Sequence, residues 1–387
     1  MKKILLIVPL ILLLSGCYSY RELNDLAIVS GVSVSMEDDE YKVALEVVNP
    51  KKMQDASNSD EPDFFVYTST DKSLQEAFRN IIKESPKKAY ASHVEVLVID
   101  ESVCKNNLGD ILDFFARDPE VRNEFYVLIS RDDDVLKVTT PLENISSTNI
   151  IDSMESNSKY LGVTNLLTYY DLISNYLNPN IELALPSIEV IGDASMGEET
   201  ENIKKTSTDA SIVLANISVF KDNKLLGYLN KDESIVYNFV RDNIKTTLIR
   251  NDYDNGEYVV NEIIDAKTKM KADIEKNKIT ISINGKASIS EANYSNDLSK
   301  AKNIEKINDD LNNNIEKMVK ENIYNIINKY NSDIFGFGQL YYKTDPKYFD
   351  KIRDKWYSDY FSNIDIDVKS KITIFEKGNL NGDIYVQ

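Results

Sequence analysis

The stretch that decides the fold is Lys278-Ile279-Thr280-Ile281-Ser282-Ile283-Asn284-Gly285-Lys286-Ala287-Ser288-Ile289. Isoleucine or alanine fills every odd position except Gly285, and the even positions are polar. Alternation of this kind predicts a β-strand with one buried and one wet face, which is typical of an antiparallel sheet. The pairs Asn255-Gly256 and Lys276-Asn277 predict tight turns between the strands of that sheet.

The residues that follow this strand predict a helix that covers it. Their apolar side chains recur at steps of three and four over about 30 residues, or roughly 45 Å of helix. They are Ile304, Ile307, Leu311, Ile315, Met318, Val319, Ile323, Ile326, Ile327 and Tyr330. A two-stranded coiled coil is the alternative interpretation of this stripe, but the one-sided sheet beside it favours packing within the domain. A shorter aromatic helix containing Trp356 and a last strand over residues 364–374 complete this region.

The first half of the chain alternates strand and helix patterns. The short apolar run at residues 94–99 predicts a strand that is buried on both faces. Other strands are expected at residues 26–34, 41–48, 125–129 and 181–191, and helices at about 71–83, 108–115, 150–156 and 164–177, with Ser69-Thr70-Asp71 as the cap of the first helix. The sequence therefore predicts an α+β protein. Its N-terminal mixed sheet has flanking helices, and its C-terminal antiparallel sheet is packed by the long helix.

A change of composition divides the chain into domains. Residues 192–209 are rich in glycine, serine and acidic residues and show no apolar periodicity, which is typical of a linker. A hairpin over residues 212–220 and 224–229 follows, joined by Asp222-Asn223. We expect the following division: a signal peptide at 1–16, an N-terminal α/β domain at 17–191, a linker at 192–209, and a C-terminal α+β region at 210–387 that can split into 210–250 and 251–387.

The start of the chain predicts export and lipid attachment. Lys2 and Lys3 precede an apolar run that ends in Leu14-Ser15-Gly16-Cys17, a small-residue cleavage site in front of a thiol. The run is about 11 residues long, whereas a membrane span needs roughly 20. We therefore expect the mature chain to begin at Cys17, to carry acyl chains there, and to lie on the outer face of a membrane. The alternative is a buried core segment followed by an ordinary cysteine.

Composition limits the possible partners. The formal net charge of the 387 residues is -18, and loss of Lys2 and Lys3 with the signal peptide makes it -20. A protein this acidic is repelled by phosphate backbones and by anionic lipid headgroups. We therefore expect no nucleic acid as a partner, and we expect the lipid to hold the protein to the membrane. The hydrophobic fraction of 42% is that of a globular protein.

The inventory of reactive residues does not favour an enzyme. His93 is the only histidine, which excludes a two-histidine zinc site, and no GxSxG motif accompanies it. Cys104 would be the only thiol left after acylation of Cys17, and its position after an apolar strand predicts an inert, buried side chain. The glycines of Gly336-Phe337-Gly338 lack the third glycine of a dinucleotide loop. We therefore expect no catalytic residue, metal or cofactor, and a binding or signalling role.

Several sequence blocks stand in order along the chain. Cys17 is followed by Tyr18-Ser19-Tyr20-Arg21-Glu22-Leu23-Asn24-Asp25-Leu26-Ala27-Ile28-Val29-Ser30-Gly31. The later blocks are Leu74-Gln75-Glu76-Ala77, Tyr90-Ala91-Ser92-His93, Val98-Ile99-Asp100-Glu101, 112–122, Val219-Phe220-Lys221, 225–229, Asp333-Ile334-Phe335-Gly336-Phe337-Gly338, Trp356 and Gly378. Together these blocks resemble the Ger(x)C family, the lipoprotein subunits of spore nutrient germinant receptors, which more often has Trp-Asp in place of Tyr18-Ser19. The resemblance covers essentially the whole chain after Cys17.

The resemblance implies a location, partners and a role. The protein would lie on the outer surface of the inner spore membrane beside two integral membrane subunits of the receptor, A-type and B-type. It would help to convert nutrient binding into germination, without catalytic residues of its own. A solute-binding lipoprotein of a transporter is the alternative, although such proteins usually show two lobes of βαβ repeats. A secreted hydrolase is a third hypothesis, which the inventory of reactive residues weakens.

Overall fold

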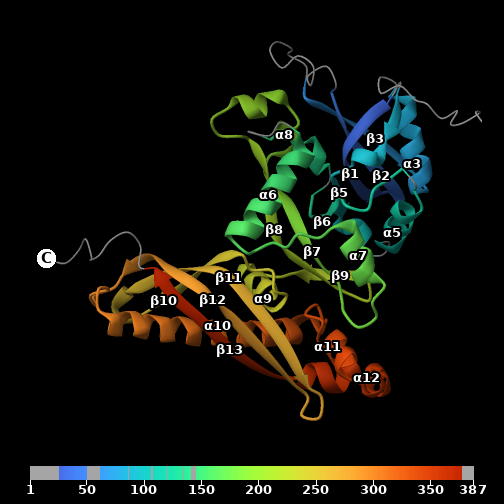
Figure 1. Ribbon diagram of the computed structural model, residues 1–387. Coiled ribbons are helices and arrows are strands. Elements are labelled where there is room, and N and C mark those ends of the chain that lie inside the picture. Colours follow the sequence, from blue (N-terminus) through green and yellow to red (C-terminus); the bar gives the residue numbers. More distant parts are fainter. Residues whose placement is uncertain are drawn as a thin grey trace, which may run out of the picture.

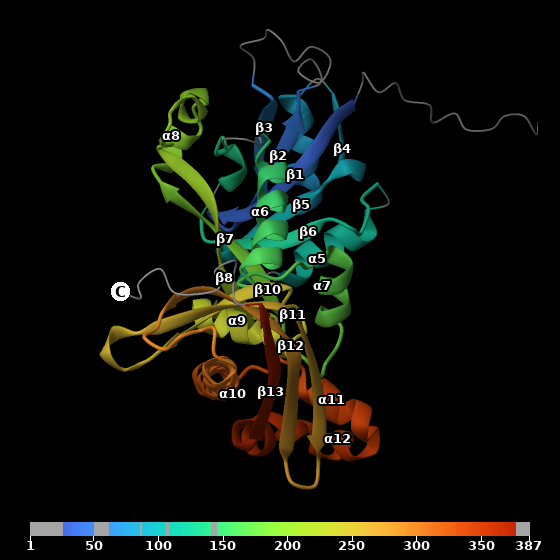
Figure 2. The ribbon, with the colours of Figure 1, turned by 60° about the vertical axis from the view of Figure 1, so that its left-hand side comes forward.

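The computed structural model of the chain has two bodies, each built on its own sheet (Figure 1). It describes residues 26–49, 62–85, 87–105, 108–118, 120–132, 134–140 and 145–376. The first body, coloured blue to green, lies above the second, coloured yellow to red, in both views (Figures 1 and 2). The predicted α+β fold, with a mixed N-terminal sheet and a C-terminal sheet under a long helix, is confirmed.

Within the described residues the first sheet has nine strands. In spatial order they are β3 (Phe64–Asp71), β2 (Glu40–Val48), β1 (Leu26–Glu37), β5 (Val96–Asp100), β6 (Tyr126–Ser130), β7 (Ala184–Gly192), β8 (Ala210–Lys221) and β9 (Lys224–Tyr228), with β4 (Lys88–Tyr90) paired to β1. The central strands β1, β5, β6 and β7 run parallel, and the strands on both sides of them pair antiparallel. The predicted hairpin is therefore β8 and β9, and it extends the first sheet.

Helices cover both faces of this sheet, because its central strands are apolar on both sides. Leu97 and Ile99 of β5 pack toward α3 (Leu74–Asn80), α5 (Leu108–Arg117) and α7 (Tyr169–Tyr176). Val96 and Val98, the alternate residues, pack toward α6 (Ser146–Tyr160). The short α4 (Glu101–Cys104) follows β5 directly. The run at 94–99 was thus correctly predicted to be buried on both faces.

The start of α3 differs from the prediction. Ser69-Thr70-Asp71, expected to cap this helix, lies in β3, and the cap is Ser73, whose hydroxyl accepts from the backbone N–H of Glu76 at 3.2 Å. The Ser73 hydroxyl also donates to the Glu76 carboxylate at 2.7 Å, so the pair resembles a capping box. β3 was not predicted as a strand because its residues from Thr68 to Asp71 are polar turn formers.

Residues 192–209, which we expected to form a linker, are an ordered connection between β7 and β8. They contain α8 (Ala194–Gly197) and the short turn η5 (Thr200–Lys204), and the two strands that they join pair within one sheet. Asn202 holds the connection in place, because the residue is 1% exposed and its side-chain amide donates to the carbonyls of Thr139 and Ala210 at 3.0 and 3.1 Å. Because a polar side chain holds this segment in place, the sequence has no apolar periodicity from which its ordered structure could be predicted.

The second sheet consists of β10 (Thr246–Asp252), β11 (Tyr258–Asp273), β12 (Lys278–Asn293) and β13 (Asp365–Glu376), in that order. The helix α10 (Ala301–Tyr330) covers its inner face, as the apolar stripe predicted. β13 runs parallel to β12, which departs from the antiparallel sheet that we expected. The reason is the connection, since α10, α11 (Phe337–Thr344) and α12 (Pro346–Ile352) carry the chain back to the starting end of β12.

Polar side chains of α10 close the free edge of β13. Each accepts a hydrogen bond from a backbone N–H that has no neighbouring strand: Asn308 from Ile374 at 2.8 Å, Asn312 from Ile372 at 2.8 Å, Glu316 from Ser370 at 2.8 Å and Tyr324 from Ile366 at 3.0 Å. Three of these residues are spaced four apart on one side of the helix, and the fourth lies two turns further on. An edge that would otherwise pair with another chain is thereby covered.

A continuous apolar core joins the two bodies. It contains the buried side chains of α9 (Lys231–Val240) and α10, the inner face of the second sheet, and Ile217 and Val219 from β8 of the first sheet. The aromatic residues Phe337, Phe349, Trp356 and Phe361 surround its lower end. The two bodies are therefore packed against each other through apolar surface, which limits their relative motion.

Candidate functional site

The residues singled out from the sequence do not come together in a catalytic site. Cys17 lies outside the described residues, so lipid attachment stays a prediction. His93 is exposed at the end of the short turn η3 (Ala91–His93), with its ring centroid 5.8 Å from that of Tyr90. Cys104 is buried, and burial raises the pKa of its thiol well above the usual value, so this side chain is an unreactive part of the core.

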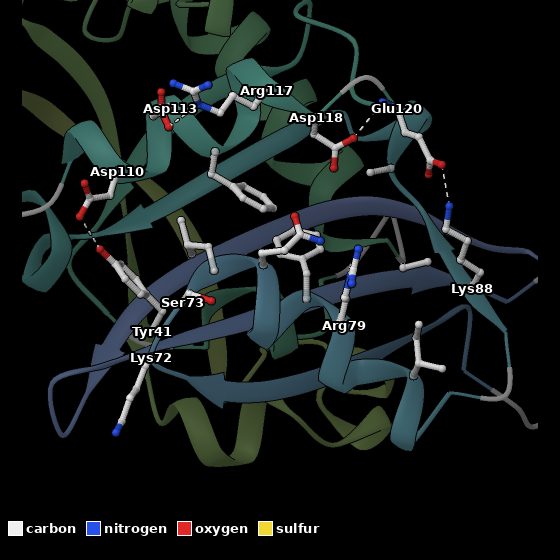
Figure 3. Close-up of a pocket in the computed structure, with 17 residues that line it drawn as sticks. Tyr41, Lys72, Ser73, Arg79, Lys88, Asp110, Asp113, Arg117, Asp118 and Glu120 are labelled. Carbon is white, nitrogen blue, oxygen red and sulfur yellow. Dashed lines mark hydrogen bonds and ion pairs between the residues drawn. The ribbon is translucent and has the colours of Figure 1, made fainter.

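A cleft of about 810 Å³ opens between α3 and α5 on the first body (Figure 3). Its floor is apolar. Phe78 from α3 and Phe114 from α5 lie with ring centroids 5.0 Å apart, and Leu74 and Ala91 also line the cleft. Ile82, just after α3, also lines the cleft and is 51% exposed. Such a floor can bury an apolar group of a ligand or partner.

Charged residues surround this floor, and most of them are paired. The hydroxyl of Tyr41 donates to Asp110 at 2.8 Å, Arg117 Nε donates to Asp113 at 2.7 Å, and Lys88 Nζ lies 2.6 Å from Glu120. The hydrogen bond from Arg117 holds the pKa of Asp113 below its usual value. Because the positive and negative groups balance, the rim does not select strongly for a ligand of one sign.

Arg79, like Lys72, lacks the ion pairs that the other cations of the rim make among the described residues. It projects from α3 into the middle of the cleft in Figure 3, and it is exposed. Among the described residues the structure gives it no ion pair. A guanidinium in this setting is available to a carboxylate or a carbonyl of whatever enters the cleft.

The cleft lies beside the point where the described chain begins. Lys88 and Ala89 of β4 form part of its wall, and β4 pairs in parallel with Leu26–Ile28, the first residues of β1. Only eight residues separate Cys17 from Leu26, a reach of about 30 Å at full extension. A lipid on Cys17 would therefore hold this end of the first body close to the membrane.

The second site of interest is the junction of the two bodies, where the Asp333-Ile334-Phe335-Gly336-Phe337-Gly338 block lies. Asp333 is fully buried, and its carboxylate accepts hydrogen bonds from the backbone N–H groups of Gly336, Phe337 and Gly338 at 2.9, 3.0 and 2.6 Å. It thus caps the N-terminus of α11. Burial raises the pKa of Asp333 to about 6, although the three hydrogen bonds act in the opposite direction.

The glycines of this block are required by close packing. Gly336 has a φ of +80°, which favours glycine, and a Cβ on Gly338 would lie 3.0 Å from the carbonyl oxygen of Asn180 in the first body. The two glycines therefore serve the junction, which agrees with the lack of a phosphate-loop motif in this part of the sequence.

Further hydrogen bonds cross the junction around Asp333. The backbone N–H of Glu182 donates to the Asp333 carbonyl at 3.0 Å, and the hydroxyl of Tyr357 donates to the Glu182 carboxylate at 2.8 Å. Lys221 Nζ, at the end of β8, donates to the Asn331 carbonyl at 2.7 Å. These contacts fix the orientation of the second body relative to the first.

A buried carboxylate also caps a helix in the first body. Glu46 of β2 is fully buried, accepts a hydrogen bond from the Ser30 hydroxyl at 2.7 Å, and accepts another from the backbone N–H of Ser147 at 3.2 Å. Ile145, the residue before α6, provides no side-chain cap, so Glu46 takes that role. Burial raises the pKa of Glu46 above its usual value.

Two further observations concern the part of the chain that the structure describes. None of its helices is both long enough and apolar enough to cross a membrane. No three or more of its His, Cys, Asp and Glu side chains are grouped so that they could hold a metal ion.

The fold and the junction define a class of protein: an α+β protein of two packed bodies, with a cleft between α3 and α5 on the first body. Comparison with known families gives two matches in order along the chain. The family model described as "Spore germination protein N-terminal domain" matches residues 19–190. The model described as "Spore germination B3/GerAC like, C-terminal" matches residues 215–378. The chain belongs to the Ger(x)C family of spore germination proteins.

Individual relatives agree with this assignment. Spore germination protein KC of Bacillus subtilis (strain 168) is 26% identical over 97% of this chain and 95% of its own length. Spore germination protein B3 of the same organism is 25% identical over 95% of this chain and 96% of its own length. The crystal structure of the GerBC protein has the same fold, with a TM-score of 0.55 at 19% identity, and the match covers 89% of this chain and 97% of that chain.

Sequence reasoning found the Asp333 block but missed its purpose, and it missed the cleft. The cleft is built by residues from four separate segments, and no single segment carries a signal for it. One partial signal exists in α5. Its buried stripe consists of Leu108, Ile111, Leu112 and Phe115. Phe114 and Arg117 lie off that stripe, so the periodicity predicts that they face a different surface.

Proposed function

We propose that the chain is the lipid-anchored subunit of a spore germinant receptor. It is attached through Cys17 to the outer face of the inner spore membrane, beside an A-type and a B-type integral membrane subunit. It catalyses no reaction and helps to couple nutrient sensing to germination. The observation that carries this proposal is the ordered match of both spore germination domain models over most of the chain.

The arrangement of the first body supports a role in assembly at the membrane. The cleft between α3 and α5 lies beside Leu26–Ile28, which directly follow the proposed tether. A tether raises the effective concentration of the body at one leaflet, so a modest contact surface is enough to bind a membrane partner. The cleft offers an apolar floor and an available guanidinium at Arg79 for a segment of such a partner.

Replacing Cys17 with Ala in the producing organism tests the anchor. We expect the protein to be lost from washed spore membranes and the response to nutrient to be slowed or absent, because one residue carries the attachment. The matched control is Cys104→Ala, which removes the buried thiol and leaves Cys17 in place. Normal membrane retention and normal germination of the Cys17→Ala spores would contradict the proposal.

The contact through the cleft is tested by Ile82→Asp. Ile82 is half-exposed in the free protein, so the substitution should leave the fold intact while it places a charge on the apolar floor. We expect the variant to stay in the membrane but to co-purify poorly with the integral subunits. Met196→Asp, at an exposed position of α8 away from the cleft, serves as the control. Equal recovery of the subunits with both variants would remove the cleft from the proposal.

A further inference from the structure

The outer face of the second sheet is basic, although the protein as a whole is strongly acidic. The segments 267–271, 280–286 and 367–375 lie side by side in β11, β12 and β13, and they contain six lysines and one acidic residue, Asp367, which lies across Thr280 from Lys271. The whole chain has 63 acidic residues against 45 lysines and arginines. These lysines lie on the face opposite to α10, which packs on the buried isoleucines of the same strands.

The strand register arranges these lysines on both sides of a row of short side chains. Lys269 of β11 and Lys369 of β13 both pair with Ser282 of the central strand β12. Lys267 and Lys371 likewise both pair with Asn284. The lysines face each other across two strand spacings, about 10 Å, and successive lysines on one strand are about 7 Å apart. Long side chains on both sides of short ones form a shallow trough, which we call the lysine trough.

Most of these ammonium groups are available. The structure gives no ion pair, among the described residues, to Lys269, Lys271, Lys369 or Lys371, all of which are exposed. The Nζ of Lys267 lies 3.8 Å from the carboxylate of Asp242, which is a long and exposed ion pair. Acidic residues occur at one end of the trough, where Asp273 follows Lys271 on β11 and Lys278 pairs with Asp365 and Asp367. The rows across Ser282 and Asn284 carry lysines alone, whereas lysines that only kept the face soluble would be expected to alternate with acidic residues there.

The other end of the trough carries an apolar group. Phe375 is 50% exposed, and Lys286 Nζ lies 5.8 Å from the centroid of its ring. An exposed aromatic ring beside a row of lysines suits a ligand that has several negative charges and an apolar residue at one end.

We propose that the lysine trough binds an acidic, extended segment of a protein partner. The spacing favours this occupant, because alternate side chains of an extended strand recur about every 7 Å, which matches the lysines along β11 and β13. The position of the trough also disfavours a membrane as occupant. β11 to β13 lie at the end of the molecule away from the start of β1 in both views (Figures 1 and 2). The position matters only if the proposed tether holds, whereas charge and register are independent of it.

The test uses the full chain purified in neutral detergent, with a fluorescent peptide of alternating glutamate and serine as the probe. We expect the fluorescence anisotropy of the peptide to rise to a plateau as protein is added. The affinity should fall as salt is added. A peptide with the same composition but all its glutamates in one block should bind more weakly, because its charges do not match the two-residue repeat. If neither peptide shows saturable binding, the proposal is overturned.

Two variants with the same change of net charge locate the site. The first combines Lys269→Glu, Lys271→Glu, Lys369→Glu and Lys371→Glu in the trough. The second combines Lys302→Glu, Lys306→Glu, Lys317→Glu and Lys320→Glu on the exposed side of α10. We expect the trough variant to bind the alternating peptide at least about tenfold more weakly, and the α10 variant to lose no more than about twofold. Equal losses would show that net charge, and not the trough, governs binding.

Two further measurements separate the trough from a folding defect and from a lipid surface. A milder trough variant with Lys→Gln at the same four positions should also lose the peptide, and circular dichroism should show an unchanged fold for it. Vesicles of phosphatidylglycerol and phosphatidylcholine test the membrane as occupant. Binding to these vesicles that depends on the trough lysines, without peptide binding, would replace the proposed acidic partner by lipid. None of these results depends on Cys17, so they stand apart from the test of the anchor.

Discussion

The two sheets of this protein differ in what covers them. The first sheet is packed by helices on both faces, and its strand β5 is apolar on both sides. The second sheet is packed on its inner face only, and its outer face carries the lysine trough. The first body therefore offers partners a cleft between two helices, whereas the second offers an open sheet. Two such different surfaces suit two different kinds of partner.

Each of the two bodies contains a buried carboxylate that caps a helix. Glu46 caps α6 within the first body, and Asp333 caps α11 at the junction. The difference lies in what depends on each. Glu46 satisfies one backbone N–H and one hydroxyl, whereas Asp333 satisfies three backbone N–H groups beside the contacts that join the bodies.

The largest expected effect is therefore that of Asp333→Ala. Three buried N–H groups lose their acceptor, which should lower the free energy of unfolding by about 4 kcal/mol. Glu46→Ala should cost about 2 kcal/mol, because fewer donors lose their partner. Urea unfolding followed by circular dichroism measures both values. A cost for Asp333→Ala equal to or below that of Glu46→Ala would contradict the special role of the junction.

The second prediction concerns pH. The pKa of Asp333 is near 3.8 in the unfolded chain and about 6 in the folded one, so between these values the folded state binds more protons. The contribution of Asp333 to the free energy of unfolding is complete below pH 4. It falls by roughly 2 to 3 kcal/mol as the pH rises through 6. Glu46, Glu95 and Glu182 also have raised pKa values and act in the same direction.

The contribution of Asp333 is isolated by subtraction. Asp333→Asn removes one titrating group and leaves the other carboxyls in place, so its stability should fall less steeply than that of the wild type between pH 4 and pH 6. Urea unfolding at intervals across this range measures both slopes. Parallel curves for the two proteins would show that Asp333 titrates no differently in the folded and unfolded chains.

The third prediction concerns the edge of the second sheet. Asn312→Ala removes the partner of both the N–H and the carbonyl of Ile372, so we expect a loss of about 2 kcal/mol and faster hydrogen exchange at Ile372. Asn313→Ala, at the next and exposed position of α10, is the control and should change neither quantity. If exchange at Ile372 is the same in both variants, α10 does not close the edge.

The smallest expected effect is at the rim of the cleft. Arg117→Ala breaks an exposed pair with Asp113 on the same helix, and solvent screens such pairs, so thermal unfolding should be unchanged within error. The pKa of Asp113 should return upward to its usual value, which NMR titration of the carboxyl measures. An unchanged pKa would show that the pair does not form in solution.

The sequence predicted the elements whose periodicity is strong and local. β12 and α10 were found over most of their length because every second or every third to fourth residue is apolar. β3 was missed, since its polar C-terminal half imitates a helix cap. The hairpin of β8 and β9 was predicted, but the pairing of β8 with β7 in the first sheet was missed, because alternation shows that a strand is half-buried but not which sheet it joins.

The surfaces were harder to predict than the fold. Register decides that Lys269 and Lys369 lie on opposite sides of Ser282, although they are 100 residues apart in the chain. The cleft likewise combines α3 with α5, and the Asp333 cap depends on the turn geometry of three consecutive N–H groups. The trough and the cleft depend on long-range packing that no local pattern encodes, whereas the Asp333 cap is local but depends on a turn geometry that composition does not reveal.

The central claim, that a lipid on Cys17 places this two-part body at the spore membrane, is tested most directly by intact-mass spectrometry of the protein isolated from spore inner membranes. We expect a chain that begins at Cys17, lacks residues 1–16, and carries the added mass of an acylated thioether. A chain with the first 16 residues still attached, or an unmodified sulfur at Cys17, would contradict the claim.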